Sequence, residues 1–207
     1  MARTSSNRSK LSAVLESATT RFATSGFDDA KWADVARDVG IGQTALYHYF
    51  QSKVHCLFAL MTVSLRETHE RFERTLAEHA DDPRAALEAL VRGTFDLSGP
   101  EILRSRIVVS EQGRLATPRQ SVLEEEARRD ARRLIREVES DWEGFLMTGM
   151  KTGDFPKQNA ELLGRAVLGT LTSVWHWYRP GGSLTLDQIA EFFTAQIATI
   201  VLQEIPG

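Results

Sequence analysis

Residues 31–53 decide the fold, and they read KWADVARDVGIGQTALYHYFQSK. In the first half, apolar side chains recur every three or four positions, at Trp32, Val35 and Val39. This spacing predicts an amphipathic helix. Gly40 follows, and because glycine accepts the left-handed backbone found at helix ends, we expect the helix to stop there. A second short helical pattern comes after the turn, and two short helices joined in this way are typical of a helix-turn-helix.

The second helix of this pair has an inward side and an outward side. Leu46 and Phe50 stand at helical spacing and are expected to face the core. The outward side carries hydrogen-bonding groups without negative charge, namely Gln43, Thr44, Tyr47 and His48. A glutamine can pair with adenine N6 and N7, and a threonine can contact a base edge or the methyl group of thymine. The pattern therefore predicts a surface that reads the major groove of DNA.

Phosphate contacts are expected on both sides of this surface. Tyr47 and His48 lie a turn further along and are better placed for phosphates than for bases. Lys53 begins the next helical pattern, so its charge adds to the positive end of that helix. Lys31 precedes the first helix and is a further candidate. The alternative interpretation is a helical hairpin inside an all-α core.

Positive charge is concentrated near the same stretch. Residues 1–55 hold seven Lys or Arg against five acids, whereas the rest of the chain holds eighteen against twenty-three, for a net charge of −3. Arg3, Arg8 and Lys10 precede the first acid, Glu16. They predict a basic arm that leads into the first helix and follows the DNA backbone or enters a minor groove.

Length and composition limit the classes of protein to which this chain can belong. The chain has 207 residues with 42% hydrophobic content, which suits one small and one larger domain. Its apolar runs fall short of the ~20 residues that span a bilayer, and its first ten residues lack the apolar segment of a secretory signal. We therefore expect a cytoplasmic protein without membrane contact. The single Cys56 excludes an internal disulfide.

The remainder of the chain shows helical spacing and no period-two alternation, so the fold class is predicted to be all-α. We expect a three-helix domain at residues 1–54 and a larger helical domain at residues 55–207. Helices are expected at 54–79, 83–97, around 102–108, 120–152, 160–178 and 186–205. In the longest, Glu124 with Arg128 and Glu125 with Arg129 are expected to form pairs on a solvated face, worth about 0.2–0.5 kcal/mol each.

The last two expected helices are more apolar than packing within one chain requires. Their apolar residues cover more than the ~100° arc of an amphipathic helix, which indicates a second partner and predicts a homodimer. Gly164, Ala166 and Gly169 are small enough to let another helix approach closely. The alternative is a thick monomeric core.

The segment LYHYFQSK after GIGQTA, with SGFDDAKWADVARDVG before it, resembles the N-terminal DNA-binding domain of TetR-family transcriptional regulators, from about Phe22 to Leu57. The resemblance implies a C-terminal ligand-binding and dimerisation domain, whose last two helices pair with their copies. Many members have a threonine before the second helix that touches a phosphate, but this chain has Ala30. DNA binding is therefore expected to depend more on Tyr47, His48 and Lys53.

The string WYRPGG, at residues 177–182, first reads as a helix stop, because Pro180 cannot continue the helix. It also looks like a signature of TetR-family members that govern lipid or sterol degradation and sense acyl-CoA thioesters. This resemblance implies an apolar tunnel for an acyl chain, with arginines near its mouth. The candidate lining residues are Phe95, Leu103, Trp142, Phe145 and Trp175, and the candidate arginines are Arg104, Arg106 and Arg114. The alternative is that these aromatic residues are ordinary core.

Catalytic chemistry finds little support in the sequence. The five histidines lack metal-site spacing, and a Gly-x-Ser-x-Gly elbow is missing. GIGQTA matches a dinucleotide fingerprint, but that chemistry needs a preceding strand where this chain has a helix. His176, between two tryptophans, is expected to be a packed core or interface residue and not a ligand. We therefore predict no enzyme, no catalytic residues, no metal site and no cofactor.

Together these observations predict a dimeric one-component transcriptional regulator. Its partners are double-stranded operator DNA and a small apolar effector, best matched by an acyl-CoA thioester, that releases a repressor from the operator. One alternative keeps the fold but makes the effector a drug-like or antibiotic molecule. Another is a helical acyl-CoA-handling protein that does not bind DNA.

Overall fold

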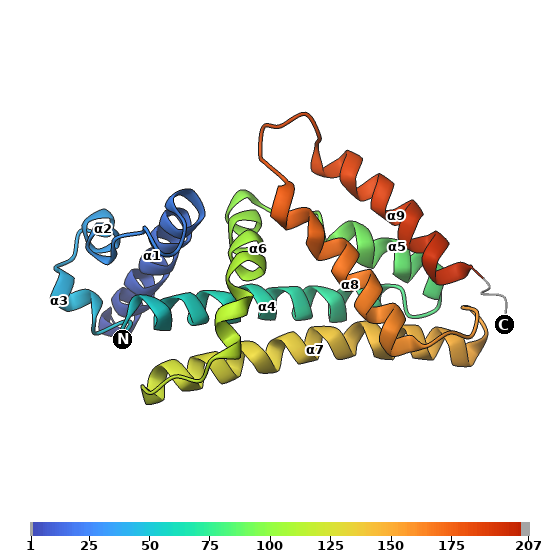
Figure 1. The fold of residues 1–207 in the computed structure, drawn as a ribbon, viewed down its shortest axis with the longest axis horizontal. Coiled ribbons are helices and arrows are strands. Elements are labelled where there is room, and N and C mark those ends of the chain that lie inside the picture. The colour runs from blue at the N-terminus through green and yellow to red at the C-terminus, as the bar shows by residue number, and fades with distance from the viewer. Residues whose placement is uncertain (1, 204–207) are drawn as a thin grey trace. The chain divides into compact units, whose positions relative to one another are not determined.

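The structure is a computed structural model that describes the backbone of residues 2–203 and the side chains of residues 9–203. Within these residues all regular secondary structure is helical (Figure 1), which confirms the all-α class. The elements are α1 Ala2–Ser25, α2 Trp32–Asp38, α3 Gln43–Leu46, α4 Lys53–Glu78, α5 Pro83–Gly93, α6 Gly99–Glu111, the 3-10 helix η1 Gln112–Ala116, α7 Val122–Thr152, α8 Ala160–Trp177 and α9 Leu186–Leu202.

Two expectations for the chain's local structure need correction. The helix expected at 83–97 ends at Gly93. The basic arm expected before the first helix is instead part of it, because α1 already begins at Ala2 and Lys10 lies within it. The side chains of Arg3 and Arg8 lie outside the described residues.

The chain divides into two compact units. The first contains Met1–Ser64 and Ser98–Arg133, and the second contains Leu65–Leu97 and Leu134–Gly207. Helices α4 and α7 each contribute to both units. The segment 98–133, which the sequence assigned to the larger domain, is thus packed with the N-terminal helices. The functional boundary between residues 54 and 55 stays a prediction.

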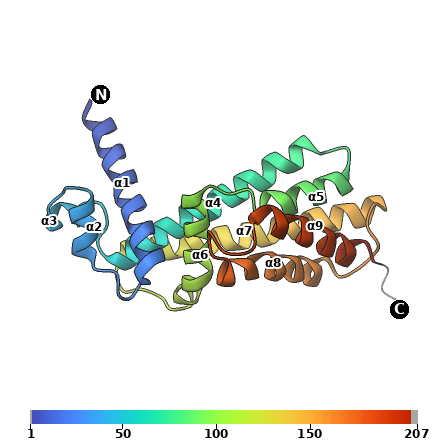
Figure 2. The ribbon, with the colours of Figure 1, turned by 90° about the horizontal axis from the view of Figure 1, so that it is seen from above.

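The first unit is organised around α1. This helix packs against α2 and α6. Figure 2 shows α2 and α3 next to each other, to the left of α1. Its fully buried Val14 and Ala18 supply part of the core, together with Leu46 from α3 and Phe58 from α4. Helix α1 ends at Ser25, and Gly26 follows it with a φ of 81°, a conformation that other residues rarely adopt.

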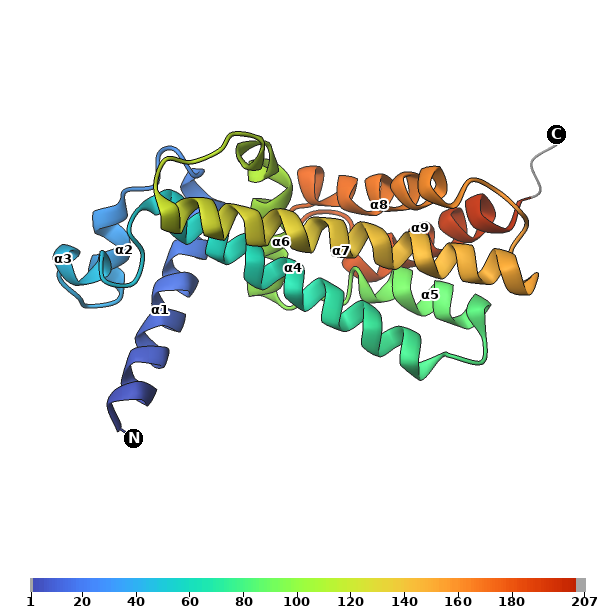
Figure 3. The ribbon, with the colours of Figure 1, turned by 90° about the horizontal axis from the view of Figure 1, so that it is seen from below.

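The second unit contains the later part of α4, α5, the later part of α7, α8 and α9 (Figure 3). Helix α9 packs against α5 and α8. The core includes the fully buried Leu146, Leu171 and Ile197, one from each of the three helices α7, α8 and α9. Glycine is required at Gly149, because a Cβ atom there would overlap the ring of Phe155. Among the described helices, none is long and apolar enough to cross a bilayer.

Candidate nucleic-acid interface and effector region

Helices α2 and α3 form the expected helix-turn-helix. The turn between them contains Gly40, with a φ of 67°, and is closed by a hydrogen bond from the Ile41 backbone N to the Ala36 carbonyl, 3.0 Å long. Leu46 is fully buried and Phe50 nearly so, which confirms the inward side of the second helix. These two buried side chains hold the opposite side of α3 at the surface.

The four predicted contact residues on that opposite side are all exposed. Gln43 and Thr44 occupy the first turn of α3, and Tyr47 and His48 follow directly after it. Tyr47 leaves 48% of its surface exposed, so its side chain is accessible to a partner. Lys31 is also exposed, and it is the N-cap residue of α2 without a side-chain capping bond. The exposed surface of this motif thus carries the amide of Gln43, the hydroxyls of Thr44 and Tyr47, the imidazole of His48 and the ammonium of Lys31.

Lys53 makes contacts that the sequence did not reveal. Its Nζ donates to the backbone carbonyls of Phe27, Asp28 and Ala30, at 2.7, 3.0 and 3.0 Å. The same atom lies 4.6 Å from the ring centroid of Phe27. Because an ammonium has three N–H donors, all of them are used inside the chain. Lys53 therefore ties the start of α4 to the turn before α2, and a phosphate would have to share or replace one of these bonds.

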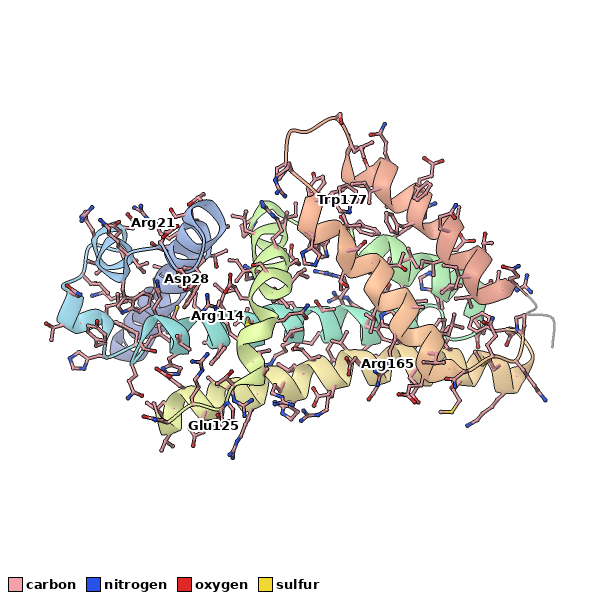
Figure 4. The ribbon with its side chains drawn as sticks, in the orientation of Figure 1. Arg21, Asp28, Arg114, Glu125, Arg165 and Trp177 are labelled. Carbon is pink, nitrogen blue, oxygen red and sulfur yellow. The ribbon has the colours of Figure 1, made fainter. Side chains whose placement is uncertain are left out.

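An ion pair ties α1 to the end of α2. The Arg21 guanidinium donates to both carboxylate oxygens of Asp38, at 2.6 and 2.8 Å, and Figure 4 labels Arg21. Ser17 Oγ donates to the same carboxylate at 2.8 Å. These bonds, led by the one from Arg21, lower the pKa of Asp38 from 3.8 to about 2. The pairing therefore joins the last residue of α2 to α1.

The segment from η1 to the start of α7 is bonded to the helix-turn-helix. Arg114 donates to the Asp28 carboxylate at 2.7 Å, and Figure 4 shows the two side chains together. Ser52 Oγ donates to Glu124 Oε1 at 2.6 Å. Gln51, the residue before Ser52, accepts a 2.7 Å hydrogen bond from the Ser121 hydroxyl. We call these three contacts the polar bridge.

The polar bridge changes two expectations. Arg114 was a candidate for the mouth of an effector tunnel, but it contacts the turn that precedes α2. Glu124 was expected to pair with Arg128 but bonds to Ser52. Both partners lie more than 70 positions away in the sequence, as the separations of 86 and 72 residues show. Helical spacing alone therefore did not indicate them.

Arg128 is also different from the prediction of a solvated face. It is only 6% exposed, and its guanidinium donates to both oxygens of Glu125 at 2.7 Å and to the Leu115 carbonyl at 2.7 Å. The Arg119 backbone N donates to Glu125 as well. The guanidinium of Arg128 and this backbone bond hold the pKa of Glu125 well below its usual range. The pair between Glu125 and Arg129 forms as predicted, at 2.8 Å.

The predicted effector residues fall in two different units. Leu103, Arg104 and Arg106 lie on α6 in the first unit and are half-buried. The four aromatic candidates lie in the second unit and are buried; they are Phe95, Trp142, Phe145 and Trp175. The structure therefore does not gather all seven candidates within one compact unit.

The aromatic candidates belong to two clusters of rings. Phe95 lies 5.9 Å from Trp175 and 5.6 Å from Phe193, measured between ring centroids. In the other cluster Trp142 lies 5.4 Å from Phe72, and Phe145 lies 5.5 Å from Phe155. Sequence reasoning missed Phe72, Phe155 and Phe193, because helical spacing identifies a buried face but not the ring it meets. In this structure the candidate rings pack against other rings.

Helices α8 and α9 carry exposed apolar side chains. Leu162 is 64% exposed and Phe192 is 59% exposed, and Trp177, which Figure 4 labels, is also exposed. Ala166 and Gly169 lie on the exposed side of α8. The surface formed by these five residues is here called the α8–α9 face. Its apolar groups match the prediction of a second apolar side on these helices.

Two residues near this face are placed differently from the prediction. Gly164 is buried, and a Cβ atom there would lie 3.5 Å from the backbone N of Glu143 on α7. Contact at this distance is ordinary van der Waals packing, so Gly164 faces the interior of the second unit and not a partner, but this interior does not require a glycine. His176 is exposed in the single chain, so of the two environments expected for it, core and interface, the core is excluded.

Comparison with known proteins agrees with this arrangement. The family profile described as "Bacterial regulatory proteins, tetR family" matches residues 14–60, and that described as "Tetracyclin repressor-like, C-terminal domain" matches residues 80–201. The HTH-type transcriptional repressor KstR2 of Rhodococcus jostii (strain RHA1) is 30% identical over 200 residues, which cover 96% of this chain and 92% of that protein.

Solved structures show the same fold. The ketosteroid transcriptional regulator KstR2 of Mycobacterium tuberculosis superposes with a TM-score of 0.75 and 26% identity, covering 94% of this chain and 95% of that one. The TetR family transcriptional regulator PfmR from Thermus thermophilus has a TM-score of 0.76 and 24% identity, with 91% and 96% covered. The chain therefore belongs to the TetR family of bacterial regulatory proteins, as a DNA-binding transcriptional regulator with an N-terminal helix-turn-helix.

Proposed function

We propose that this protein is a dimeric transcriptional repressor that leaves its operator when a small effector binds. The observation that carries the proposal is the exposed group Gln43, Thr44, Tyr47 and His48, held outward by the burial of Leu46 and Phe50. The R. jostii relative is named a repressor, which supports this direction of control. As a repressor of transcription, it is expected to act in the cytoplasm.

Each residue of the helix-turn-helix surface has an expected role. Gln43 and Thr44 stand on the first turn of α3, where an entering helix meets base edges, so we assign them to base contacts. Tyr47, His48 and Lys31 are assigned to phosphates, which fix the register of the protein on the duplex. Lys53 supports the surface through its three backbone carbonyls, and any phosphate contact of its own adds to that role.

Dimerisation is proposed to occur through the α8–α9 face. Homodimers are typical of the family, and a twofold dimer presents two recognition helices to two half-sites. Leu162 and Phe192 are large apolar side chains that are more than half exposed in the single chain. Burial of these groups against a second copy would remove apolar surface from water at about 25 cal/mol per Å².

The proposed effector is an acyl-CoA thioester that enters the second unit. The WYRPGG string at residues 177–182 supports it, as does a structural neighbour with a TM-score of 0.74, AibR, which was solved with isovaleryl coenzyme A and operator DNA. The acyl chain would lie among the rings of Phe95, Trp142, Phe145 and Trp175, which must separate to admit it. Leu103, Arg104 and Arg106 lie on α6 in the first unit, and their proposed contact with the CoA end of the ligand is supported by the family resemblance alone.

Helix α4 is the proposed route from effector to DNA. It begins next to the helix-turn-helix and continues into the second unit. A ligand that favours another tilt of α4 would shift the two recognition helices away from the ~34–36 Å separation of successive major grooves. A coupling of about 1–3 kcal/mol, equivalent to about 5- to 150-fold in affinity, would suffice for release.

A footprint followed by effector release tests the proposal. The full chain is added to the DNA upstream of its own gene, and we expect a protected palindrome. The control is Lys151→Ala, which removes an exposed side chain of α7 in the second unit and should leave the footprint unchanged. Absence of any protected site at low salt would contradict DNA binding and favour a protein that handles acyl-CoA without DNA.

The effector is tested on the same complex in a mobility assay. A panel of acyl-CoA thioesters of different chain shape should include at least one that releases the DNA, whereas free coenzyme A should not. Release by apolar drug-like molecules but by no thioester would contradict the acyl-CoA assignment and favour the drug-like or antibiotic alternative. The DNA-binding part of the proposal would survive that result.

A further inference from the structure

His69, Glu73 and Asp141 form a cluster that the regulatory function does not use. His69 and Glu73 stand one turn apart on α4, and Asp141 lies on α7. His69 Nδ1 is 2.7 Å from Asp141 Oδ2. One nitrogen or oxygen atom from each of the three side chains lies within 4.8 Å of the others. All three residues belong to the second unit, so the cluster is defined within one compact body.

The surroundings of the cluster are negatively charged. Glu137, one turn before Asp141, contributes with Glu73 to a higher pKa for both His69 and Asp141. The bond to Asp141 is the main cause of the raised pKa of His69. For Asp141 the main cause is burial, which disfavours the charged carboxylate. Three carboxylates and one imidazole thus share a region that would be stabilised by a cation.

We propose that His69, Glu73 and Asp141 bind a divalent transition-metal ion, and that Zn²⁺ fits best. An imidazole nitrogen with carboxylate oxygens suits Zn²⁺ better than Mg²⁺ or Ca²⁺, which prefer oxygen ligands alone. Glu137 supplies further negative charge next to the site. Water completes the coordination, because four ligands are usual for zinc in proteins.

The required movements are small. Zinc lies about 2.0–2.2 Å from nitrogen and oxygen ligands, so ligand atoms in a tetrahedral site are about 3.4 Å apart. His69 Nδ1 and Asp141 Oδ2, now 2.7 Å apart, must separate slightly, and the widest pair, within 4.8 Å, must close. Glu73 is exposed and can rotate to do so. The ion would take the place of the hydrogen bond between His69 and Asp141, and because metal ions bind the deprotonated ligands, binding should weaken at acidic pH.

The site was invisible in the sequence because its ligands come from two helices. His69 and Asp141 are 72 positions apart, whereas the spacing rules for metal sites concern neighbours in sequence. The i,i+4 spacing of His69 and Glu73 places both on one side of α4, and α7 supplies the third ligand. A bound ion would cross-link α4 and α7 within the second unit and stabilise the folded state.

Calorimetric titration of the full, untagged protein with Zn²⁺ tests the proposal. After removal of metals with EDTA and dialysis, the protein should bind one ion per chain at neutral pH. His69→Gln and Asp141→Asn keep the size of each side chain, and Glu73→Gln changes an exposed position that the fold does not need. Each should weaken binding by about tenfold or more. The control is His79→Gln, because His79 lies on the turn after α4 and its ring bonds to the backbone carbonyl of Thr75.

A second measurement distinguishes metal binding at this cluster from nonspecific binding elsewhere on the protein surface. Co²⁺ in place of Zn²⁺ should give a visible absorption band in the natural protein and in His79→Gln, and the band should be lost in Glu73→Gln. The melting temperature should rise on addition of Zn²⁺ in the same two proteins only. Equal binding by all variants would mean an adventitious ion only, and absence of binding by the natural protein would equally overturn the proposal.

Discussion

Each compact unit has its own apolar core, but the two units differ in the side-chain contacts that are added to it. In the first, polar side chains join distant segments, as in the bonds of Lys53 to three carbonyls and of Arg114 to Asp28. In the second, the aromatic contacts of Trp142 with Phe72 and of Phe95 with Trp175 connect the helices. Hydrogen bonds are directional and each contributes little net stability, about 0.5–1.5 kcal/mol. Ring burial depends on filled volume and is worth several times more per residue.

This difference has a functional meaning for a regulator. Polar contacts exchange readily with water or with phosphate, so the first unit can adjust when it docks on DNA. An aromatic interior resists change unless a ligand replaces the contacts that it breaks. The second unit is thus suited to respond to an apolar effector, and the first to respond to a charged duplex. Four substitutions or conditions can test this contrast.

The largest effect is expected in the aromatic interior. Trp142→Ala removes a ring that is 4% exposed and packed against Phe72 and Phe145, and it should lower the free energy of unfolding by about 3–5 kcal/mol. Urea unfolding followed by circular dichroism measures the change. Leu123→Ala is the control, because Leu123 is 49% exposed and should cost little. Equal effects of the two substitutions would remove the contrast between the units.

Dimerisation should be the next most sensitive property. Phe192→Glu places a charge on the α8–α9 face and should weaken the dimer by about 2–4 kcal/mol, the range of strong interface positions. Sedimentation equilibrium would then show monomers at concentrations where the natural protein is dimeric. Val122→Glu, on an exposed side chain of α7 in the first unit, should leave the dimer intact. Dimers that persist in Phe192→Glu would exclude this residue from the interface.

A smaller effect is expected for the polar contacts of the first unit. Lys53→Met keeps the apolar stem but leaves three carbonyls without their donor, and it should cost about 1–3 kcal/mol of stability. Lys31→Met is the matched control and should stay within about 0.5 kcal/mol, since Lys31 is exposed. Thermal unfolding of the two variants checks this. If Lys53→Met unfolded like the natural protein, the three bonds of Lys53 to backbone carbonyls would not stabilise the fold.

The smallest effect is expected from acid. The pKa of Asp38 is lowered from 3.8 to about 2, so its pairing with Arg21 stabilises the fold above pH 4 and is lost as the pH falls towards 2. Asp38→Asn should therefore be less stable than the natural protein at neutral pH, and the difference should vanish below pH 2. A difference that is independent of pH would show that the carboxylate charge does not matter.

Local sequence predicted the helix-turn-helix well but not what supports it. The burial of Leu46 and the exposure of Thr44 follow from positions within one short segment, where helical spacing decides which side faces the core. The contacts of Lys53, Arg128 and Gly164 depend on segments brought together only by folding. From the sequence, Lys53 was predicted to contact a phosphate, Arg128 to lie on a solvated face and Gly164 to face a partner. Their actual acceptors and neighbours lie in distant parts of the chain, which local spacing does not indicate.

The effector region shows the same limit in another form. The family resemblance named Phe95 and Trp142 as lining candidates, and both are buried, but it did not reveal that they belong to separate ring clusters. Assignment of these residues to a ligand rests on family resemblance and remains a proposal. The same reason explains the missed cluster of His69 and Asp141, since two helices must meet before its ligands are neighbours.

Selection of bound sequences from a random pool of duplexes tests the reading of DNA by α3 most directly. The natural protein should select a palindrome, and Gln43→Ala should change the preferred base at one symmetric pair of positions, where the discrimination lost is about 1–3 kcal/mol. Lys31→Ala should keep the same preferred sequence and reduce the salt dependence by about one phosphate contact. An identical preferred sequence for the natural protein and Gln43→Ala, or no enriched sequence at all, would contradict base recognition by this surface.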